Sequence, residues 1–368
     1  MSSRPDFGKM QLDIFQRKDP GGILWQPRLD YWYNVNKKRD TLPVHLQNAS
    51  LLDVYDYCHA SCRYVSRSNP WLGVRYRNVE VATEWLDDDR VRRTWHTPIG
   101  SLTQISHYDE WHVSSHIVEY RLKRPDDFKI LKHLLEDEEW YWDADRYQQD
   151  MAIFGAYAAP QFYFRRSPLQ RLFINEMSLQ ETIYFMVDYP DLFGEYVEFA
   201  TAADDAMYDI ICNCPVEILN LGENIDGFID SPPTWRNYLV PYYRKRIEQL
   251  HAAGKSVSIH FDGVMKPLLP YLQEAPFDAI EAATPAPQGD VTLEEIKQAL
   301  GDMILVDGIP ALYFLADQYS TNTLIDCAHQ VVEMFHPRLV LGVSDEVPPD
   351  SDIERVRLIG ELAQEVGQ

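Results

Sequence analysis

The stretch SVSIHFDG, residues 256–263, decides how the fold of this 368-residue chain is read. Its first four residues are small or β-branched, as in a buried β-strand, and a histidine and an aspartate follow one residue apart before a glycine. Because residues two apart in a strand project on the same side, we expect His260 and Asp262 to lie together at the strand's end. Three roles stay open for this pair: metal ligands, acid/base groups, or a hydrogen bond that only shapes the loop.

The same pattern recurs on both sides of this stretch. Apolar runs such as VEILNL, MILVDGI and RLVLGV alternate with amphipathic helical segments from about residue 150 to the end. Such alternation, at least five times over, predicts a parallel sheet covered by helices. An open doubly wound sheet and a closed eight-stranded barrel both fit, but the GxGxxG fingerprint of the open sheet does not occur in the sequence.

Polar residues stand where each predicted strand ends. In a βα barrel all strand carboxyl ends open on one face, where active sites lie, so these side chains would converge. The alternative is that loops begin with polar residues because caps and turns require them. We favour the convergent site, and therefore an enzyme. The strand-end residues are Glu223, Asn224, His260, Asp262, Glu281, Thr284, Asp307 and 344–346.

The first part of the chain is aromatic and irregular. We expect a single domain, with an N-terminal extension and first elements at about residues 1–95 and the main barrel at about 96–368. RVRRTWHTPIGSLTQIS and WHVSSHIVEYRLK alternate like strands of a hairpin, and RPDDFKILKHLLEDEEWYWD predicts an amphipathic helix at residues 124–143. The candidates for lining an aromatic substrate pocket are Trp25, Arg28, Trp32, Tyr163 and Phe164.

The composition narrows the class of protein. With 57 acidic against 34 basic residues the formal charge is −23, which argues against general attraction to nucleic acid or anionic membranes. The five cysteines are an odd number, and we find neither a secretory signal nor a run of the ~20 apolar residues that a membrane helix needs. We therefore expect a soluble cytoplasmic protein, and a homodimer is compatible with the sequence.

Three blocks of the sequence resemble the uroporphyrinogen decarboxylase superfamily, which includes the decarboxylase and corrinoid-linked methyltransferases. They are NIDGFIDSPPTWRNYLVPYYRKRIEQLHAAGKSVSIHFDG, IEAATPAPQGDVTLEEIKQALGD and VLGVSDEVPPDSDIERV, in the order and spacing of the family. The similarity runs from about residue 216 to the end, with weaker echoes in LWQPRLDYW and TWHTPIG. The resemblance implies a single (β/α)8 TIM barrel.

The two branches of the superfamily differ in their motifs. The decarboxylase grips substrate carboxylates with an R-Q-A-G-R motif, whereas WQPRLDYW offers only Arg28. It also usually carries G-H-G on a late strand, where this chain has Val343-Ser344-Asp345. The resemblance therefore favours the methyltransferase branch.

That branch places zinc between an H-x-C motif on one strand and the cysteine of a C-[DE]-I-P-like motif on the last. This chain has H-F-D at residues 260–262 and D-E-V-P at 345–348, so aspartate replaces both family cysteines. Zinc accepts carboxylate oxygen as well as imidazole nitrogen. The resemblance thus implies a retuned metal site of His260, Asp262 and Asp345. Glu223, which follows the predicted strand EILNL, is a candidate for a further ligand because of that position.

Oxygen-rich ligands leave a metal a stronger Lewis acid than thiolates do, which suits the departure of phenolate or alkoxide from a methyl ether. We expect a methyltransferase that moves a methyl group from a small methoxy-aromatic or other O-methyl substrate to the cobalt of a corrinoid (cobalamin) on a partner protein. Zinc is the favoured metal, but carboxylate ligands also suit Mg²⁺ or Mn²⁺, and a site without metal stays open. His260 and Asp262 are the expected catalytic residues. Two alternatives stay open: a decarboxylase or lyase without metal, and a non-catalytic barrel that binds a tetrapyrrole or a protein.

Overall fold

The computed structural model describes residues 5–64 and 71–366. They form a mixed α/β protein with two compact units. The first unit comprises Met1–Asn69, Asp145–Phe164 and Pro215–Gln368, and the second comprises Pro70–Ala144 and Arg165–Cys214. The boundary expected near residue 95 lies inside the second unit, whereas the N-terminal extension and the single-domain organisation stay predictions.

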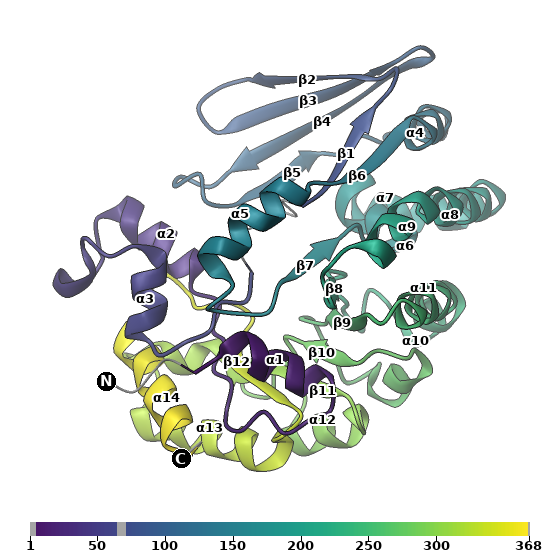
Figure 1. Cartoon of the computed structure of the whole chain (residues 1–368). Coiled ribbons are helices and arrows are strands. Elements are labelled where there is room, and N and C mark those ends of the chain that lie inside the picture. Colours follow the sequence, from purple (N-terminus) through teal and green to yellow (C-terminus); the bar gives the residue numbers. More distant parts are fainter. Residues whose placement is uncertain (1–4, 65–70, 367–368) are drawn as a thin grey trace. The chain divides into compact units, whose positions relative to one another are not determined.

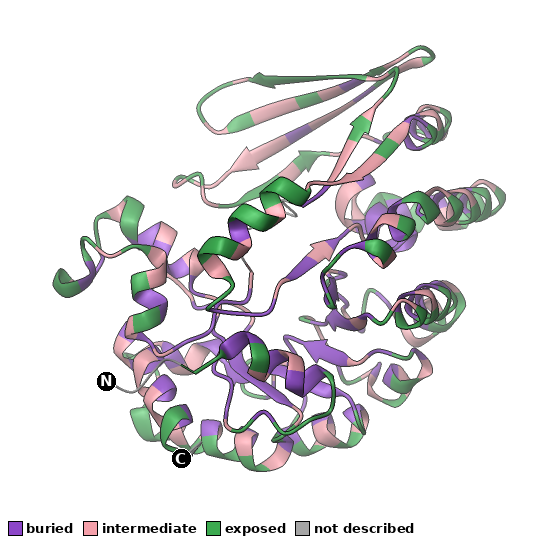
Figure 2. Cartoon of the chain, viewed as in Figure 1, coloured by how far each residue is buried: buried purple, intermediate pink, exposed green. Residues whose placement is uncertain are grey.

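A six-stranded parallel sheet forms the centre of the first unit, as the strand–helix alternation predicts. The strands follow one another in sequence order across the sheet, and they curve around a common centre (Figure 1). Nearly every strand residue is buried, which explains why the strands read as continuous apolar runs rather than alternating ones (Figure 2). The strands are β7 (Gln161–Phe164), β8 (Ile218–Leu221), β9 (Ser256–His260), β10 (Ala279–Glu281), β11 (Ile304–Pro310) and β12 (Leu339–Ser344).

Helices connect β8 to β9, β10 to β11 and β11 to β12, and a short 3-10 helix connects β9 to β10. These helices present mixed faces, with buried residues toward the sheet and exposed ones outward (Figures 1 and 2). Local signals fix their ends: Thr292 and Glu295 form a capping box at the start of one, and Gly254, with φ of +74°, follows the end of another. The helices of this unit are α1 (Phe7–Phe15), α2 (Asp30–Arg39), α3 (Leu51–Tyr57), α5 (Ala144–Phe154), α10 (Pro232–Thr234), α11 (Val240–Ala252), α12 (Leu293–Leu300), α13 (Thr321–Phe335) and α14 (Ile353–Val366).

Helix α1 packs against the amino ends of the strands. Its Phe7, Ile14 and Phe15 share one buried cluster with Ile218 and Ile304, which are the first residues of β8 and β11. The amino-terminal face of the sheet is therefore filled with apolar side chains. Function must be sought at the opposite, carboxyl-terminal face.

The closed eight-stranded barrel that we expected is not present among the strands of the described residues; six strands form the sheet. Two short segments lie between its edge strands β12 and β7. Trp25 forms a parallel bridge with Leu341, and Ser61 N donates to Trp25 O at 2.8 Å. Gln161 Nε2 of β7 in turn donates to Arg63 O at 2.9 Å. Each segment makes too few backbone pairs to count as a strand.

The second unit is built on an antiparallel sheet of β2 (Glu80–Trp85), β3 (Arg90–Thr97), β4 (Gly100–Tyr108) and β5 (Ser115–Glu119). The pairing of β4 with β5 confirms the predicted hairpin, but its first stretch forms two strands, β3 and β4, rather than one. The helix predicted over residues 124–143 is shorter than expected: α4 (Asp127–Glu136) ends before EEWYW, which forms β6 (Glu138–Trp142) and pairs with β1 (Leu72–Tyr76). Pairing with the distant strand β1 makes this aromatic run a β-strand rather than the end of the helix. The remaining helices are α6 (Pro168–Arg171), α7 (Leu179–Asp188), α8 (Pro190–Ala203) and α9 (Asp205–Asn213). In neither unit is any described helix long and apolar enough to cross a membrane.

Candidate functional site

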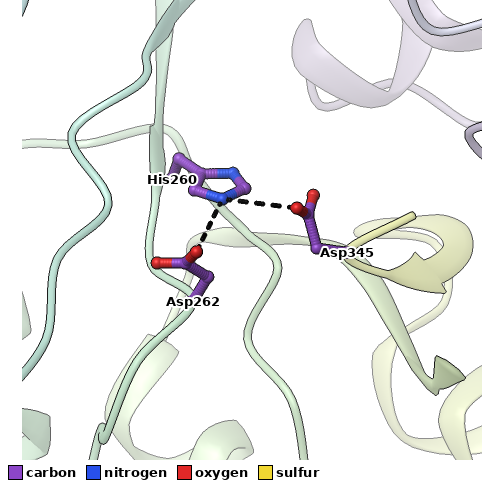
Figure 3. Close-up of side chains that lie close together, drawn as sticks. All are labelled: His260, Asp262 and Asp345. Carbon is purple, nitrogen blue, oxygen red and sulfur yellow. Dashed lines mark ion pairs between the residues drawn. The ribbon is translucent and has the colours of Figure 1, made fainter. Parts of the chain in front are cut away.

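Three acceptor atoms converge at the carboxyl-terminal edge of the sheet. His260 ends β9, Asp262 follows two residues later, and Asp345 follows β12 (Figure 3). The Nε2 atom of His260 lies 3.4 Å from Asp262 Oδ2 and 3.9 Å from Asp345 Oδ2. All three ligand atoms lie within 4.8 Å of one another. The structure thus brings together three of the four predicted metal ligands.

Glu281 fixes the orientation of the histidine. It ends β10, directly opposite His260 in the parallel ladder, and its Oε2 lies 2.9 Å from His260 Nδ1. Its side chain is fully buried. Because Nδ1 faces this carboxylate, Nε2 is the nitrogen that points toward Asp262 and Asp345.

The Glu281 carboxylate has four further donors. Tyr163 OH donates to Oε2 at 2.8 Å and Asn220 Nδ2 at 2.6 Å, while Tyr64 OH donates to Oε1 at 2.8 Å and Arg63 Nη1 at 3.0 Å. Burial alone would raise the Glu281 pKa, but the hydrogen bond and charge of His260 and the charges of two arginines hold that pKa well below its usual range. Glu281 is therefore an anchored anion behind the histidine.

Arg63 connects Glu281 to a second buried acid, Asp307 of β11. Its Nη1 also donates to Asp307 Oδ2 at 3.0 Å, and its Nη2 pairs with Asp307 Oδ1. Burial raises the pKa of Asp307 to about 6, although Arg63 opposes the rise. Gly342 of β12 makes room for this pair, since a Cβ there would overlap Asp307 Oδ1 and lie 2.8 Å from Arg63 Nη2.

Two opposing effects act on the His260 pKa. Burial alone would lower it, because the charged imidazolium loses hydration, whereas the hydrogen bonds to Asp262 and Glu281 raise it. The second effect dominates and brings the pKa to about 10. The Asp262 pKa is lowered, because His260 outweighs the opposing effect of burial. The space between these groups therefore favours a cation, either the proton of the imidazolium or a metal ion.

Arg28 lies beside Asp345. Its Nη1 pairs with Asp345 Oδ1 and its Nη2 donates to Glu346 Oε1 at 2.6 Å. Its guanidinium carbon also lies 5.6 Å from the centre of the Tyr64 ring. Because Arg28 holds one oxygen of Asp345, the other oxygen faces His260.

The other residues predicted for the site lie elsewhere. Glu223 is fully buried and accepts a hydrogen bond from Tyr243 OH at 3.1 Å, outside the group of three acceptors. Trp25 is buried and stacks on Phe314. Buried Trp32 donates from Nε1 to Ser351 O at 3.1 Å. Buried Phe164 belongs to the core. We retain only Arg28 and Tyr163 of the predicted pocket residues in the proposed site.

Five residues in this constellation were not assigned from the sequence. Glu281 and Asp307 were recognised as polar residues at the ends of predicted strands. Nothing in the sequence distinguished them from the other polar residues at strand ends. Arg63 and Tyr64 follow a helix in a segment without periodicity, so their position became visible only in the fold. Asn220 lies within a buried strand, in an apolar run that gave it no functional signal.

The comparison with protein families decides the family. The family model described as Uroporphyrinogen decarboxylase (URO-D) matches residues 175–366. The chain belongs to the URO-D family. That match includes His260, Asp262, Glu281 and Asp345, and it begins upstream of the residue 216 that we expected from the sequence. The recognised superfamily, whose named member is an enzyme, is thus confirmed, whereas the corrinoid-linked branch stays a prediction.

No curated protein sequence matches this URO-D family chain. Among solved structures, it is similar to a B12-independent methionine synthase from Shewanella sp. W3-18-1, with 10% identity, a TM-score of 0.42, and 93% of this chain and 94% of that chain covered. It is also similar to a D-psicose 3-epimerase from Clostridium cellulolyticum H10, with 9% identity, a TM-score of 0.35, and 66% and 87% of the two chains covered.

Proposed function

We propose that this chain is a metal-assisted methyltransferase that moves a methyl group from a small O-methyl substrate to the cobalt of a corrinoid on a partner protein. The observation that supports it most is the convergence of His260 Nε2 with one oxygen each of Asp262 and Asp345. Aspartates stand where the sequence motifs of the methyltransferase branch carry thiolates. We also interpret the first unit as a (β/α)8 barrel whose two remaining positions are held by residues 24–26 and 60–63.

The three groups fit a divalent cation. An imidazole nitrogen and two carboxylate oxygens are ligands that zinc accepts, and Mg²⁺ or Mn²⁺ accepts carboxylates as well. Hydrogen bonding of the second imidazole nitrogen to a carboxylate is the usual support of a metal-binding histidine, and Glu281 supplies it here. When bound, the metal supplies Lewis acidity to the ether oxygen of the substrate.

The residues of the chain hold the components of the reaction in place. Glu281 keeps Nε2 of His260 directed at the two aspartates, and Arg28 keeps Asp345 from turning away. In the reaction the methyl C–O bond breaks and its electron pair stays on the oxygen, which then takes up a proton. The methyl group forms a bond to cobalt(I), the nucleophile that the corrinoid protein provides.

Methyl transfer to free cob(I)alamin tests this function without the natural partner. Zinc-loaded full chain is incubated with a panel of methoxy-aromatic compounds, and methylcobalamin formation is followed spectroscopically. We expect turnover that disappears after chelation and in His260→Ala, and that persists in His329→Ala, which removes an exposed histidine of α13. Equal turnover in His260→Ala, or after complete metal removal, would contradict the proposal.

One observation favours a second candidate, a metal-free decarboxylase. The matching family model is that of a decarboxylase, and a His260 pKa of about 10 keeps the imidazole protonated as a general acid. Uroporphyrinogen is the test substrate. Release of CO2 from uroporphyrinogen by the metal-stripped chain would support this candidate. A chain that transfers methyl groups but releases no CO2 from uroporphyrinogen would contradict it.

A further inference from the structure

Every guanidinium at the candidate site is already held between two carboxylates. From this juxtaposition, and resting on the proposed function, we propose that the methyl donor is an uncharged or cationic methoxy compound and that donors with a carboxylate are rejected. The inference concerns the charge of the methyl donor, which the proposed methyltransferase function does not specify.

The accessible part of the site is acidic. The Asp262 side chain is 31% exposed and those of Asp345 and Glu346 are each 35% exposed. Arg28, the cation beside them, is only 18% exposed. An approaching ligand therefore meets three carboxylates and one largely covered guanidinium.

Both terminal nitrogens of Arg28 are engaged by carboxylates. One terminal nitrogen pairs with Asp345 and the other donates to Glu346 at 2.6 Å, while the ring of Tyr64 lies 5.6 Å from the guanidinium carbon. To bind a substrate carboxylate in the usual fork with both terminal nitrogens, Arg28 would have to weaken its pairing with these acids. These carboxylates would then lie beside the incoming anion, and such a juxtaposition of like charges selects against a ligand.

The buried layer behind the metal ligands repeats this pattern. Arg63 is 1% exposed and is shared between Glu281 and Asp307, which are both fully buried. Together the two layers hold five carboxylates against two guanidinium groups, so the formal charge is −2 with protonated His260 and −1 with neutral His260 and a divalent ion. Charges at a partly buried site are weakly screened, so this net negative charge repels an anionic methyl donor. It does not repel a neutral or cationic donor.

Three probes with the same methoxyaryl group separate charge from shape. They are 4-methoxybenzyl alcohol, 4-methoxybenzylamine and 4-methoxybenzoate, which are neutral, cationic and anionic at pH 7. Binding to zinc-loaded full chain is measured by titration calorimetry. We expect 4-methoxybenzoate to bind at least about tenfold more weakly than the alcohol, and the amine to bind at least as tightly as the alcohol.

Glu346→Gln tests the cause of this order. The substitution removes one accessible negative charge, keeps the shape of the side chain and leaves the three acceptor atoms unchanged. The ratio of the dissociation constant of the benzoate to that of the alcohol should therefore fall by about threefold. Glu333→Gln, at an exposed position of α13, is the matched control and should leave the ratio unchanged.

Benzoate binding as tight as alcohol binding in the wild type would overturn the inference, as would failure of all three probes to bind or an unchanged ratio in Glu346→Gln. These outcomes are independent of the proposed function. That function fails instead if bound methoxy probes never transfer their methyl group.

Discussion

Nδ1 of His260 lies 2.9 Å from Oε2 of the fully buried Glu281. The two residues end neighbouring parallel strands and lie opposite each other in the ladder, so the sheet itself sets their contact. With Nδ1 engaged, Nε2 is left to face Asp262 and Asp345. This relationship orients His260 so that its Nε2 and the two aspartates form a candidate ligand set.

Glu281→Gln tests that relationship. The amide keeps the shape of the side chain but loses the charge that orients the imidazole, so we expect zinc affinity to fall by roughly 10–100-fold. The measurement is competitive titration against a chromophoric chelator. Glu223→Gln is the matched control, because Glu223 is equally buried but lies outside the three acceptors. Loss of zinc in Glu223→Gln and not in Glu281→Gln would contradict the arrangement.

Replacing both aspartates by cysteine tests the interpretation of a retuned metal site. Asp262→Cys with Asp345→Cys restores thiolates at both positions, and softer ligands favour zinc over Mg²⁺ and Mn²⁺. We expect tighter zinc binding, and a thiolate-to-metal charge-transfer band when Co²⁺ replaces zinc. The double Asp→Ser variant is the control and should bind zinc more weakly than the wild type. A double cysteine variant without the charge-transfer band would show that the two positions do not share a metal.

The raised pKa of His260 predicts a pH dependence of stability in the metal-free chain. The folded-state pKa of about 10 lies above the unfolded value of about 6.5, so protonation of His260 stabilises the fold. This contribution is fully present below about pH 6.5 and is lost as the pH rises through 10. The free energy of unfolding in urea should therefore be larger for the wild type than for His260→Gln at about pH 6. This difference should be smaller at about pH 10. A difference that does not change with pH would be contrary to the expected ion pairing.

Gly342→Ala tests the packing around Asp307 and Arg63. An added Cβ would overlap the Asp307 carboxylate, and overpacking of a buried site of this kind costs about 1–3 kcal/mol. Gly194→Ala is the control, because this exposed position in helix α8 has no atom within 4 Å of the new Cβ. Alanine should raise the free energy of unfolding there by about 0.5–1 kcal/mol, since it favours the helix more than glycine does. Both values come from urea unfolding. Equal stability of the two variants would mean that Gly342 is not under this constraint.

The sequence predicted much of the sheet because its strands are continuous apolar runs with clear helix caps between them. It did not predict how the sheet continues beyond β12 and β7, since residues 24–26 and 60–63 have no strand periodicity. The prediction of a helix at residues 138–142 was wrong, because pairing with β1 outweighs the local helical pattern there.

The pair His260 and Asp262 was visible from strand periodicity, and Asp345 from the family motif. Arg28 was expected to face the substrate, but its position between Asp345 and Glu346 depends on contacts across more than 300 residues of chain. Glu281 could not be distinguished from other strand-end polar residues without the register between β9 and β10. Strand register and long-range ion pairs are the information that one sequence does not contain.

The metal content of the purified full chain tests the central claim most directly. After dialysis against a zinc buffer, elemental analysis should find about one zinc ion per chain in the wild type, with loss in His260→Ala and retention in His329→Ala. A wild-type chain that transfers methyl groups while it contains no metal, or one whose zinc is unaffected by His260→Ala, would contradict the account.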